Sequence, residues 1–228
     1  MKYKAVVFDL FGTLINNIPS PINESMLVEM ASILTVSGKE SIRLWSDTYD
    51  QRSTGIFQNA EESIRYICKE LGVSPPSTQV ELAVRLRNEF IERMITPRPD
   101  SLEVLSYLKS ASYKSGLITD CSAETVICWE KLPIANLIDV SVFSCSVGLK
   151  KPDPRIYHLA VEQLGVYPGD CLYIGDGGSQ ELTGAAAVGM HSVLIRHHDE
   201  DSSGINYERE EWRGTVITSL KEVLELVK

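Results

Sequence analysis

Two acids and a pair of lysines, far apart in the sequence, each follow a short apolar run and could act on a phosphate group. Asp9 follows the run AVVF, Asp176 follows LYIG, and Lys150-Lys151 lies between them in the chain. A buried carboxylate is costly unless a cation or hydrogen-bond donors accompany it. Mg²⁺ binds one or two carboxylates together with a substrate phosphate. A Mg²⁺ ion between the acids, with a lysine beside them, would let Asp9 attack phosphorus and form an aspartyl-phosphate.

A third apolar run, SGLITD, ends in Thr119 and Asp120. Thr119, with the amides that follow it at the start of a helix, would hold the remaining phosphoryl oxygens. Asp120 would contribute its backbone amide, and its side chain could cap the next helix. A plain role for Thr119 at the start of a helix stays open as the alternative.

The elements that carry these residues alternate between strand and helix. Apolar strands are expected at 4–10, 115–120, 137–145, 170–176 and 191–196, and helices at 101–110, 122–131, 154–165, 179–189 and 219–228. This alternation predicts a doubly wound α/β fold, a parallel sheet covered on both faces. Ligands of such sheets bind at the carboxyl ends of the strands. Asp9, Thr119, Asp176 and a lysine should therefore converge at one place.

The alternation is interrupted after the first strand. Between residues 19 and 96 only helical patterns are found, around 27–34, 42–49, 59–71 and 82–94, with Asn59 and Glu62 as a candidate capping box. The prediction is a core domain of residues 1–15 and 97–228 and an all-helical domain of residues 16–96. The acidic, polar segment 199–214 is expected to be a loop.

Composition excludes several other classes of function. The formal net charge of -9 argues against binding to nucleic acid or an anionic membrane, because both need a basic surface. No apolar run approaches the ~18 residues of a membrane span. The five cysteines form no CxxC pair, which argues against a structural zinc site, and their odd number favours a reducing compartment. A cytoplasmic protein that acts on a small molecule is expected.

Four segments resemble the motifs of the haloacid dehalogenase-like (HAD) hydrolase superfamily, in the same order: FDLFGTL, LITD, GLKKPDPRIY and YIGDGGSQELTGA. The helical insertion resembles the cap of the subclass whose cap follows the first strand. The resemblance implies Asp9 as nucleophile and Mg²⁺ held by Asp9, the Phe11 carbonyl and Asp176. It implies Thr119 and Lys151 at the phosphate, with Lys151 preferred over Lys150 because the family lysine directly precedes proline. Glu181 occupies the position of the last acid of the fourth motif, where it would hold the residues that contact the metal and the phosphate without contacting either itself.

Phe11 departs from the phosphatase pattern. Phosphatases of the family have a second Asp there, which protonates the leaving group and activates water, and positioned acid–base catalysis contributes ~10²–10⁴-fold. The related 2-haloacid dehalogenases carry an aromatic residue at this position and use no metal. They lack an acid like Asp176, however, and they have an Arg after a cap Trp. Here Ser46 follows Trp45, and Arg43 or Arg52 would have to substitute.

The residues and the resemblance together leave three interpretations. The preferred one is a Mg²⁺-dependent phosphatase for a small phosphorylated metabolite, with Phe11, Thr119, Asp120 and Lys151 in contact with the substrate. The alternatives are a 2-haloacid dehalogenase and a phosphate- or metal-binding relative with little turnover.

Overall fold

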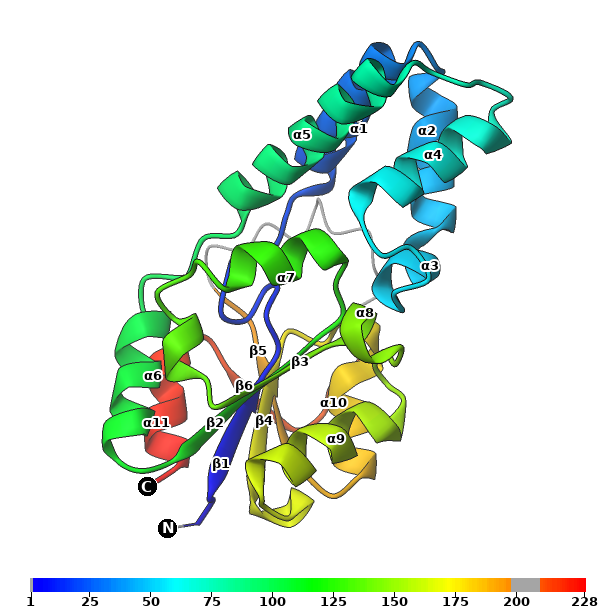
Figure 1. Cartoon of the computed structure of the whole chain (residues 1–228). Coiled ribbons are helices and arrows are strands. Elements are labelled where there is room, and N and C mark those ends of the chain that lie inside the picture. The colour runs from blue at the N-terminus through cyan, green and yellow to red at the C-terminus, as the bar shows by residue number, and fades with distance from the viewer. Residues whose placement is uncertain (1, 198–209) are drawn as a thin grey trace.

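The computed structural model describes residues 2–197 and 210–228 and has a parallel sheet at its centre (Figure 1). Six strands lie in the order β3-β2-β1-β4-β5-β6, and each neighbouring pair is parallel. Their bounds are β1 Ala5–Phe8, β2 Lys114–Thr119, β3 Val140–Phe143, β4 Cys171–Gly175, β5 His191–Ile195 and β6 Thr215–Ile217. The predicted doubly wound α/β fold is confirmed.

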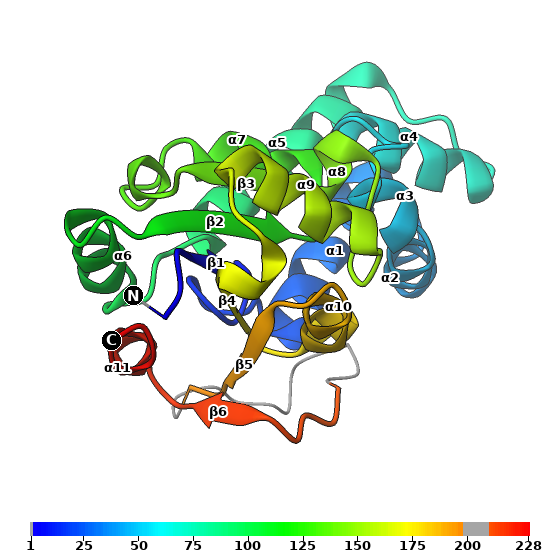
Figure 2. The ribbon, with the colours of Figure 1, turned by 90° about the horizontal axis from the view of Figure 1, so that it is seen from below.

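The central strand β1 is apolar throughout because both of its faces are covered. Val6 and Phe8 belong to one buried cluster, together with residues of α6 (Ser101–Ser110) and α11 (Val223–Leu226). Ala5 and Val7 belong to the other, with residues of α9 (Pro154–Leu164) and α10 (Glu181–Ala187). Figure 2, seen from below, shows these helix pairs on opposite sides of the sheet. Packed on both faces, the sheet holds the residues that follow the carboxyl ends of its strands in fixed positions.

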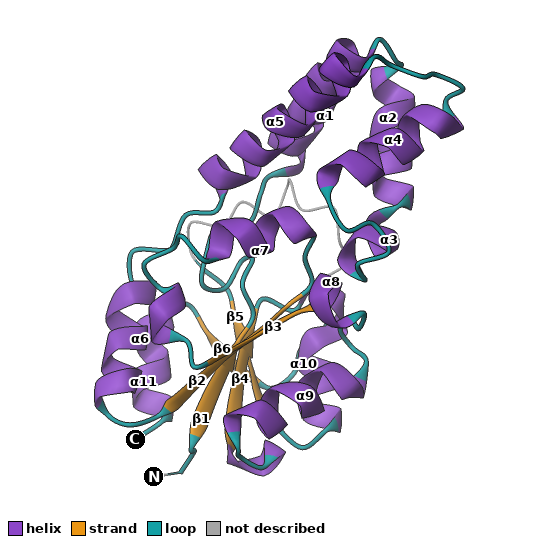
Figure 3. Ribbon diagram, in the orientation of Figure 1, coloured by secondary structure: helices purple, strands orange, loops and turns teal. Residues whose placement is uncertain are grey.

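Five helices, all between β1 and β2, stand beyond the carboxyl ends of the strands (Figure 3). They are α1 Ser20–Leu34, α2 Gly38–Asp47, α3 Tyr49–Ser53, α4 Ala60–Glu70 and α5 Ser77–Met94, called below the inserted helices. Both chain termini lie at the opposite end of the sheet (Figure 1). A ligand that approaches the carboxyl ends of the strands from above the sheet must therefore pass the inserted helices.

Turn residues delimit the inserted helices much as the sequence suggested. Asn59 accepts a hydrogen bond from the Glu62 amide at 3.0 Å and caps α4. The expected capping box is only half formed, because Glu62 Oε2 accepts from the amide of Gln58 rather than from that of Asn59. The helix expected at 42–49 is divided at Thr48 into α2 and α3.

Shorter helices complete the connections near the strand ends. They are α7 Ala123–Trp129, α8 Ser144–Val147 and the 3₁₀ turns Ala135–Leu137, Pro168–Asp170, Gly178–Gln180 and Leu220–Glu222. The edge strand β6 was not expected, because its three residues are too few for an apolar pattern to stand out. Of the loop expected at 199–214, residues 199–209 lie outside the described residues.

A search of the described helices finds none that is both long and apolar enough to cross a bilayer.

Candidate active site

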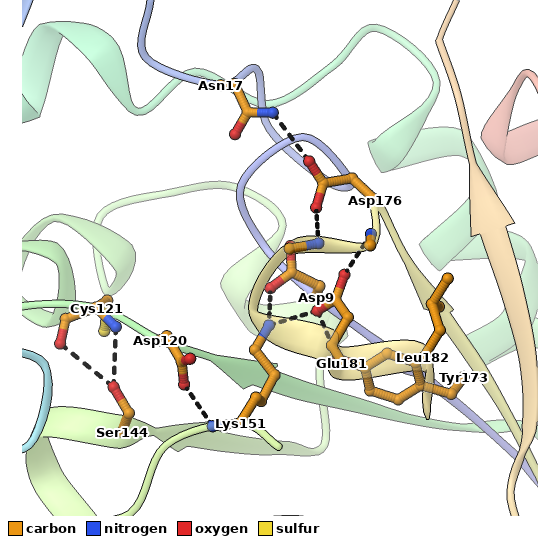
Figure 4. A network of polar contacts seen from close by, with 12 residues as sticks. Asp9, Asn17, Asp120, Cys121, Ser144, Lys151, Tyr173, Asp176, Glu181 and Leu182 are labelled. Carbon is orange, nitrogen blue, oxygen red and sulfur yellow. Dashed lines mark hydrogen bonds and ion pairs between the residues drawn. The ribbon is translucent and has the colours of Figure 1, made fainter. Parts of the chain in front are cut away.

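Three of the residues expected at the strand ends, Asp9, Asp176 and Lys151, meet in one buried network (Figure 4). Asp9 directly follows β1, and Asp176 directly follows the neighbouring strand β4. Lys151 comes from the loop between α8 and α9. All three are buried, with 5%, 2% and 3% of their surface exposed. The adjacency of β1 and β4 explains why residues so distant in sequence lie together.

Lys151 joins two carboxylates. Its Nζ donates to Asp9 Oδ1 and to Glu181 Oε2, both at 2.5 Å. Burial alone would lower the pKa of Lys151, but the charges of Asp9 and Glu181 outweigh burial and raise it well above its usual value. The lysine is therefore a fixed cation beside Asp9. Its backbone amide donates to Asp120 Oδ1 at 3.0 Å, which ties its loop to the end of β2.

Glu181 is a fully buried anchor for this network. Besides Lys151, it accepts from the Tyr173 hydroxyl at 2.9 Å and from the Gly177 amide at 3.0 Å. Burial, with the charge of Asp9, raises the pKa of Glu181 well above its usual value. Because its oxygens are already occupied by donors, Glu181 positions Lys151 and the turn after β4.

Asp176 is held by neighbours on both oxygens. Oδ1 accepts from the Gly178 amide at 3.0 Å, and Oδ2 accepts from Asn17 Nδ2 at 3.1 Å. The turn after Asp9 packs directly against this carboxylate, since a Cβ built on Gly12 would lie 2.5 Å from Asp176 Oδ2, and Gly12 has a φ of +74°. Only glycine fits there, which explains the glycine of the segment FDLFGTL.

The charges at this place favour a bound divalent cation. Asp9, Asp176 and Glu181 each offer an oxygen within 4.8 Å of the others, so three carboxylates face one ammonium group. When all are ionised, two negative charges are left over, and buried excess charge is strongly unfavourable. Burial raises the pKa of Asp9 to about 6, while Lys151 opposes the shift and Asp176 adds to it. The donor set is all oxygen, as Mg²⁺ prefers. Asp9 and Asp176 thus fit a magnesium site.

The residues at the end of β2 only partly follow expectation. Thr119 is fully buried, its Oγ1 has no hydrogen-bond partner in the described part of the chain, and it does not line the cavity beside Asp9. Asp120 does line that cavity. The expectation that the Asp120 side chain caps the next helix was wrong, because its Oδ1 is engaged by Lys151. Its carboxylate organises the lysine loop instead.

A cavity of about 610 Å³ opens above Asp9, Asp176 and Lys151. Its floor is formed by strand-end residues, and its walls come largely from the inserted helices, including Trp45, Tyr49, Arg52 and Arg87. Phe11 also lines it and is partly buried. Lys150 pairs with Asp50 of α3 at 2.5 Å and links the core to the inserted helices.

Sequence reasoning did not identify several residues of this site. Asn17 and Tyr173 hold Asp176 and Glu181, yet Tyr173 looks like ordinary strand sequence and Asn17 like a loop residue. Arg87 lies on a helix of unremarkable amphipathic pattern. Of the two arginines considered for the substrate, Arg52 lines the cavity, while Arg43 is exposed and pairs with Glu40 and Asp47.

Loss of the Lys151 charge is expected to destabilise the fold. Lys151→Met leaves Asp9 and Glu181 buried without their cation, which costs about 3–5 kcal/mol. Urea denaturation in the presence of a chelator measures the loss. The matched control is Lys150→Met, whose half-exposed pair with Asp50 is worth under about 1 kcal/mol. Equal losses for both variants would contradict the role of Lys151.

Comparisons with known proteins find both phosphatases and dehalogenases. A glyceraldehyde 3-phosphate phosphatase of Methanopyrus kandleri is 28% identical over 199 residues, covering 85% of this chain and 84% of the relative. An (S)-2-haloacid dehalogenase of Pseudomonas fluorescens is 27% identical over 182 residues, covering 75% of each. The crystal structure of a HAD phosphatase from Thermococcus onnurineus has the same fold, with a TM-score of 0.68, 23% identity and coverage of 98% and 97%.

Phosphatases and dehalogenases therefore stand at similar distances, and the relatives alone do not select the reaction. The model of one family, haloacid dehalogenase-like hydrolase, matches residues 3–189, which contain all four motifs and the inserted helices. The chain belongs to this family, and it is a hydrolase.

Proposed function

We propose that the protein is a Mg²⁺-dependent phosphatase that acts on a small phosphorylated metabolite through an aspartyl-phosphate on Asp9. The observation that carries the proposal is the set of Asp9, Asp176 and Lys151 at the floor of a cavity, with carboxylates in excess of cations. A dehalogenating site has no need of a metal, and therefore no need of Asp176 beside its nucleophile.

Asp9 and Asp176 would hold the metal, with the Phe11 carbonyl as the third protein ligand. When bound, Mg²⁺ neutralises the repulsion between the carboxylate and the phosphoryl group and acts as a Lewis acid. Lys151 keeps the ionised Asp9 oriented, and its ammonium group also attracts phosphoryl oxygens. The Asp120 amide and, once the end of β2 adjusts to the substrate, the Thr119 hydroxyl are assigned to the remaining oxygens. The Cys121 amide already donates to Ser144 Oγ at 2.9 Å.

Two transfers complete the reaction. An oxygen of Asp9 forms a bond to phosphorus while the bond from phosphorus to the leaving oxygen breaks, and the leaving oxygen takes a proton from water. Water then attacks phosphorus, releases inorganic phosphate and restores the Asp9 carboxylate. Phe11 can neither donate nor accept the protons of these steps. The enzyme should therefore favour good leaving groups, such as aryl or acyl phosphates, and release phosphate from Asp9 slowly.

Residues 16–96 are assigned to a cap domain that selects the substrate. The inserted helices provide most of the cavity wall, and the pair between Lys150 and Asp50 connects them to the loop that carries Lys151. A cap in this position excludes water from the site while the substrate reacts.

Two observations favour the alternative hypothesis of a dehalogenase: the aromatic residue Phe11 and the similarity to a haloacid dehalogenase. A substrate panel separates it from the proposal: aryl, acyl and sugar phosphates and 2-chloropropionate, each with Mg²⁺ and with chelator. Phosphate release that requires Mg²⁺ is expected. Chloride release without metal would overturn the proposal, and turnover of no substrate would favour a binding protein.

Mg²⁺ is expected to stabilise the protein more at pH 7.5 than at pH 5. The pKa of Asp9 is raised from 3.8 to about 6, so the fold prefers the protonated carboxyl. Stability contributed by Asp9 is therefore present below pH 3.8 and is lost as the pH rises through about 6. Because Mg²⁺ binds the ionised form, it should restore about 2.7 kcal/mol at 100 times its Kd, and less in acid.

Calorimetric melting with and without Mg²⁺ at the two pH values measures this effect. Asp9→Asn serves as the control and should lose most of the increase at pH 7.5. Equal increases at both pH values, or an increase that survives in the variant, would place the metal elsewhere.

A further inference from the structure

Two arginines of the inserted helices line the same cavity as Asp9. Arg52 of α3 and Arg87 of α5 are 5% and 7% exposed. Their guanidinium carbons lie 4.2 Å and 5.0 Å from the centre of the Trp45 ring. Two buried guanidinium groups thus pack against one aromatic side chain. Arginine is rarely buried unless its charge is paired, so the partners of these two groups matter.

Charge at this wall is unbalanced in the direction opposite to the floor. Glu124 pairs with Arg87, with 3.2 Å between Nε and Oε1. Among the residues that the structure describes, Arg52 donates only to neutral acceptors, the Thr48 hydroxyl at 2.7 Å and the Trp45 carbonyl at 2.6 Å. Two cations therefore face one carboxylate, and one positive charge is left over. Burial and the charge of Arg87 lower the pKa of Arg52 to about 9, in keeping with this imbalance.

Arg87 also has an unused donor. Its Nη1 is buried and has no hydrogen-bond partner among the described residues. Leaving a buried donor unpaired is unfavourable, and more so when the donor is charged. Arg43, on the exposed side of α2, instead pairs with two acids, Glu40 and Asp47. The missing partner at the cavity wall is the one that a bound anion would supply.

We propose that Arg52 and Arg87 form a binding site for a carboxylate at the end of the substrate opposite its phosphate. A guanidinium group binds a carboxylate through two parallel hydrogen bonds. One carboxylate would cancel the single excess charge, whereas a second phosphate would overshoot it. The inference rests on the proposed phosphatase function for the other end of the substrate. It makes a small phosphorylated carboxylic acid the preferred substrate, in place of a phosphorylated aldehyde or alcohol.

Matched substrates test the site in the unaltered protein. The panel is 3-phosphoglycerate, glyceraldehyde 3-phosphate, glycerol 3-phosphate and propane-1,3-diol bisphosphate, assayed with Mg²⁺. The kcat/KM for 3-phosphoglycerate should exceed that for the aldehyde and the alcohol by about 10-fold to 100-fold, the range of a hydrogen bond to a charged group. Equal values, or a preference for the bisphosphate, would overturn the carboxylate assignment.

Arg52→Gln is the sharper variant, because removing Arg52 leaves no buried acid without its partner. It should raise KM for 3-phosphoglycerate about 10-fold or more with little change in kcat, and alter the values for glycerol 3-phosphate less than about 3-fold. Arg87→Gln should act in the same direction but also lower stability, since it strands Glu124. The control is Arg43→Gln, at an exposed arginine, which should leave the selectivity unchanged.

A binding measurement separates failure of this site from failure of the phosphatase proposal. Glycerate, which has no phosphate, is titrated calorimetrically into wild-type protein and Arg52→Gln. Binding that requires Arg52 supports the carboxylate site even if no phosphate ester is hydrolysed. Hydrolysis of phosphate esters with no preference for the acid, and no glycerate binding, would refute the carboxylate site while the phosphatase stands.

Discussion

Asp9→Asn is expected to abolish hydrolysis, with kcat reduced roughly 10⁴-fold or more, as for loss of a covalent nucleophile. The amide has nearly the shape of the carboxylate, but it cannot attack phosphorus and it removes one metal ligand. Lys151 Nζ would keep Glu181 as a partner, so the fold should survive. Steady-state kinetics on the best phosphate ester, with circular dichroism to confirm folding, measures the effect.

The control for Asp9→Asn is Asp170→Asn. Asp170 lies at the opposite end of the sheet and pairs with the exposed Lys4 at 2.8 Å. Its change should leave kcat within about 2-fold, because a surface pair contributes about 0–1 kcal/mol to stability and nothing to the site. If Asp9→Asn retained a tenth of the wild-type rate, Asp9 would not be the nucleophile.

Phe11→Asp is expected to raise phosphatase activity by ~10²-fold, the lower end of what a positioned acid–base group contributes. Phe11 lines the cavity that holds Asp9, so a carboxyl there could protonate a leaving oxygen and then activate water. The gain should be largest for alkyl phosphates, whose leaving groups need a proton, and smallest for aryl phosphates. Rates on both classes with saturating Mg²⁺ measure it.

Phe11→Asn separates acid–base chemistry from the simple removal of an aromatic ring. Asparagine has the size and polarity of aspartate but cannot transfer a proton. Its rate should stay within a few-fold of the wild type. If Phe11→Asp gave no increase, or if Phe11→Asn gave the same one, Phe11 would not account for slow turnover.

The positions of Asp9 and Asp176 could be predicted from the sequence because each acid directly follows an apolar run. An apolar run followed by an acid predicts a buried strand with the acid at its carboxyl end, and this applies to Asp9 and Asp176 alike. Choosing Lys151 over Lys150 needed the resemblance to the family. In the structure the two lysines differ in kind, since Lys151 is buried between two acids, whereas Lys150 is partly exposed and pairs with Asp50.

What escaped prediction depends on long-range packing. The partner of Arg87 is Glu124 in a different helix, and no local pattern links residues so far apart. Asn17 reaches Asp176 only because the turn at Gly12 folds back over that carboxylate. Thr119 shows the reverse case, since its place at the strand end was foreseeable but its exclusion from the cavity surface was not. The local sequence determines where a strand ends, whereas the direction in which each side chain points depends on residues that are distant in the sequence.

Detection of the phosphorylated nucleophile is the most direct test of phosphoryl transfer to Asp9. Wild-type protein is mixed with Mg²⁺ and an aryl phosphate, quenched in acid within the first turnovers, digested and analysed by peptide mass spectrometry. An acyl phosphate on Asp9 is predicted, and it should accumulate because Phe11 cannot activate the water that removes it. Turnover of phosphate esters with no phosphate on Asp9 would contradict the account.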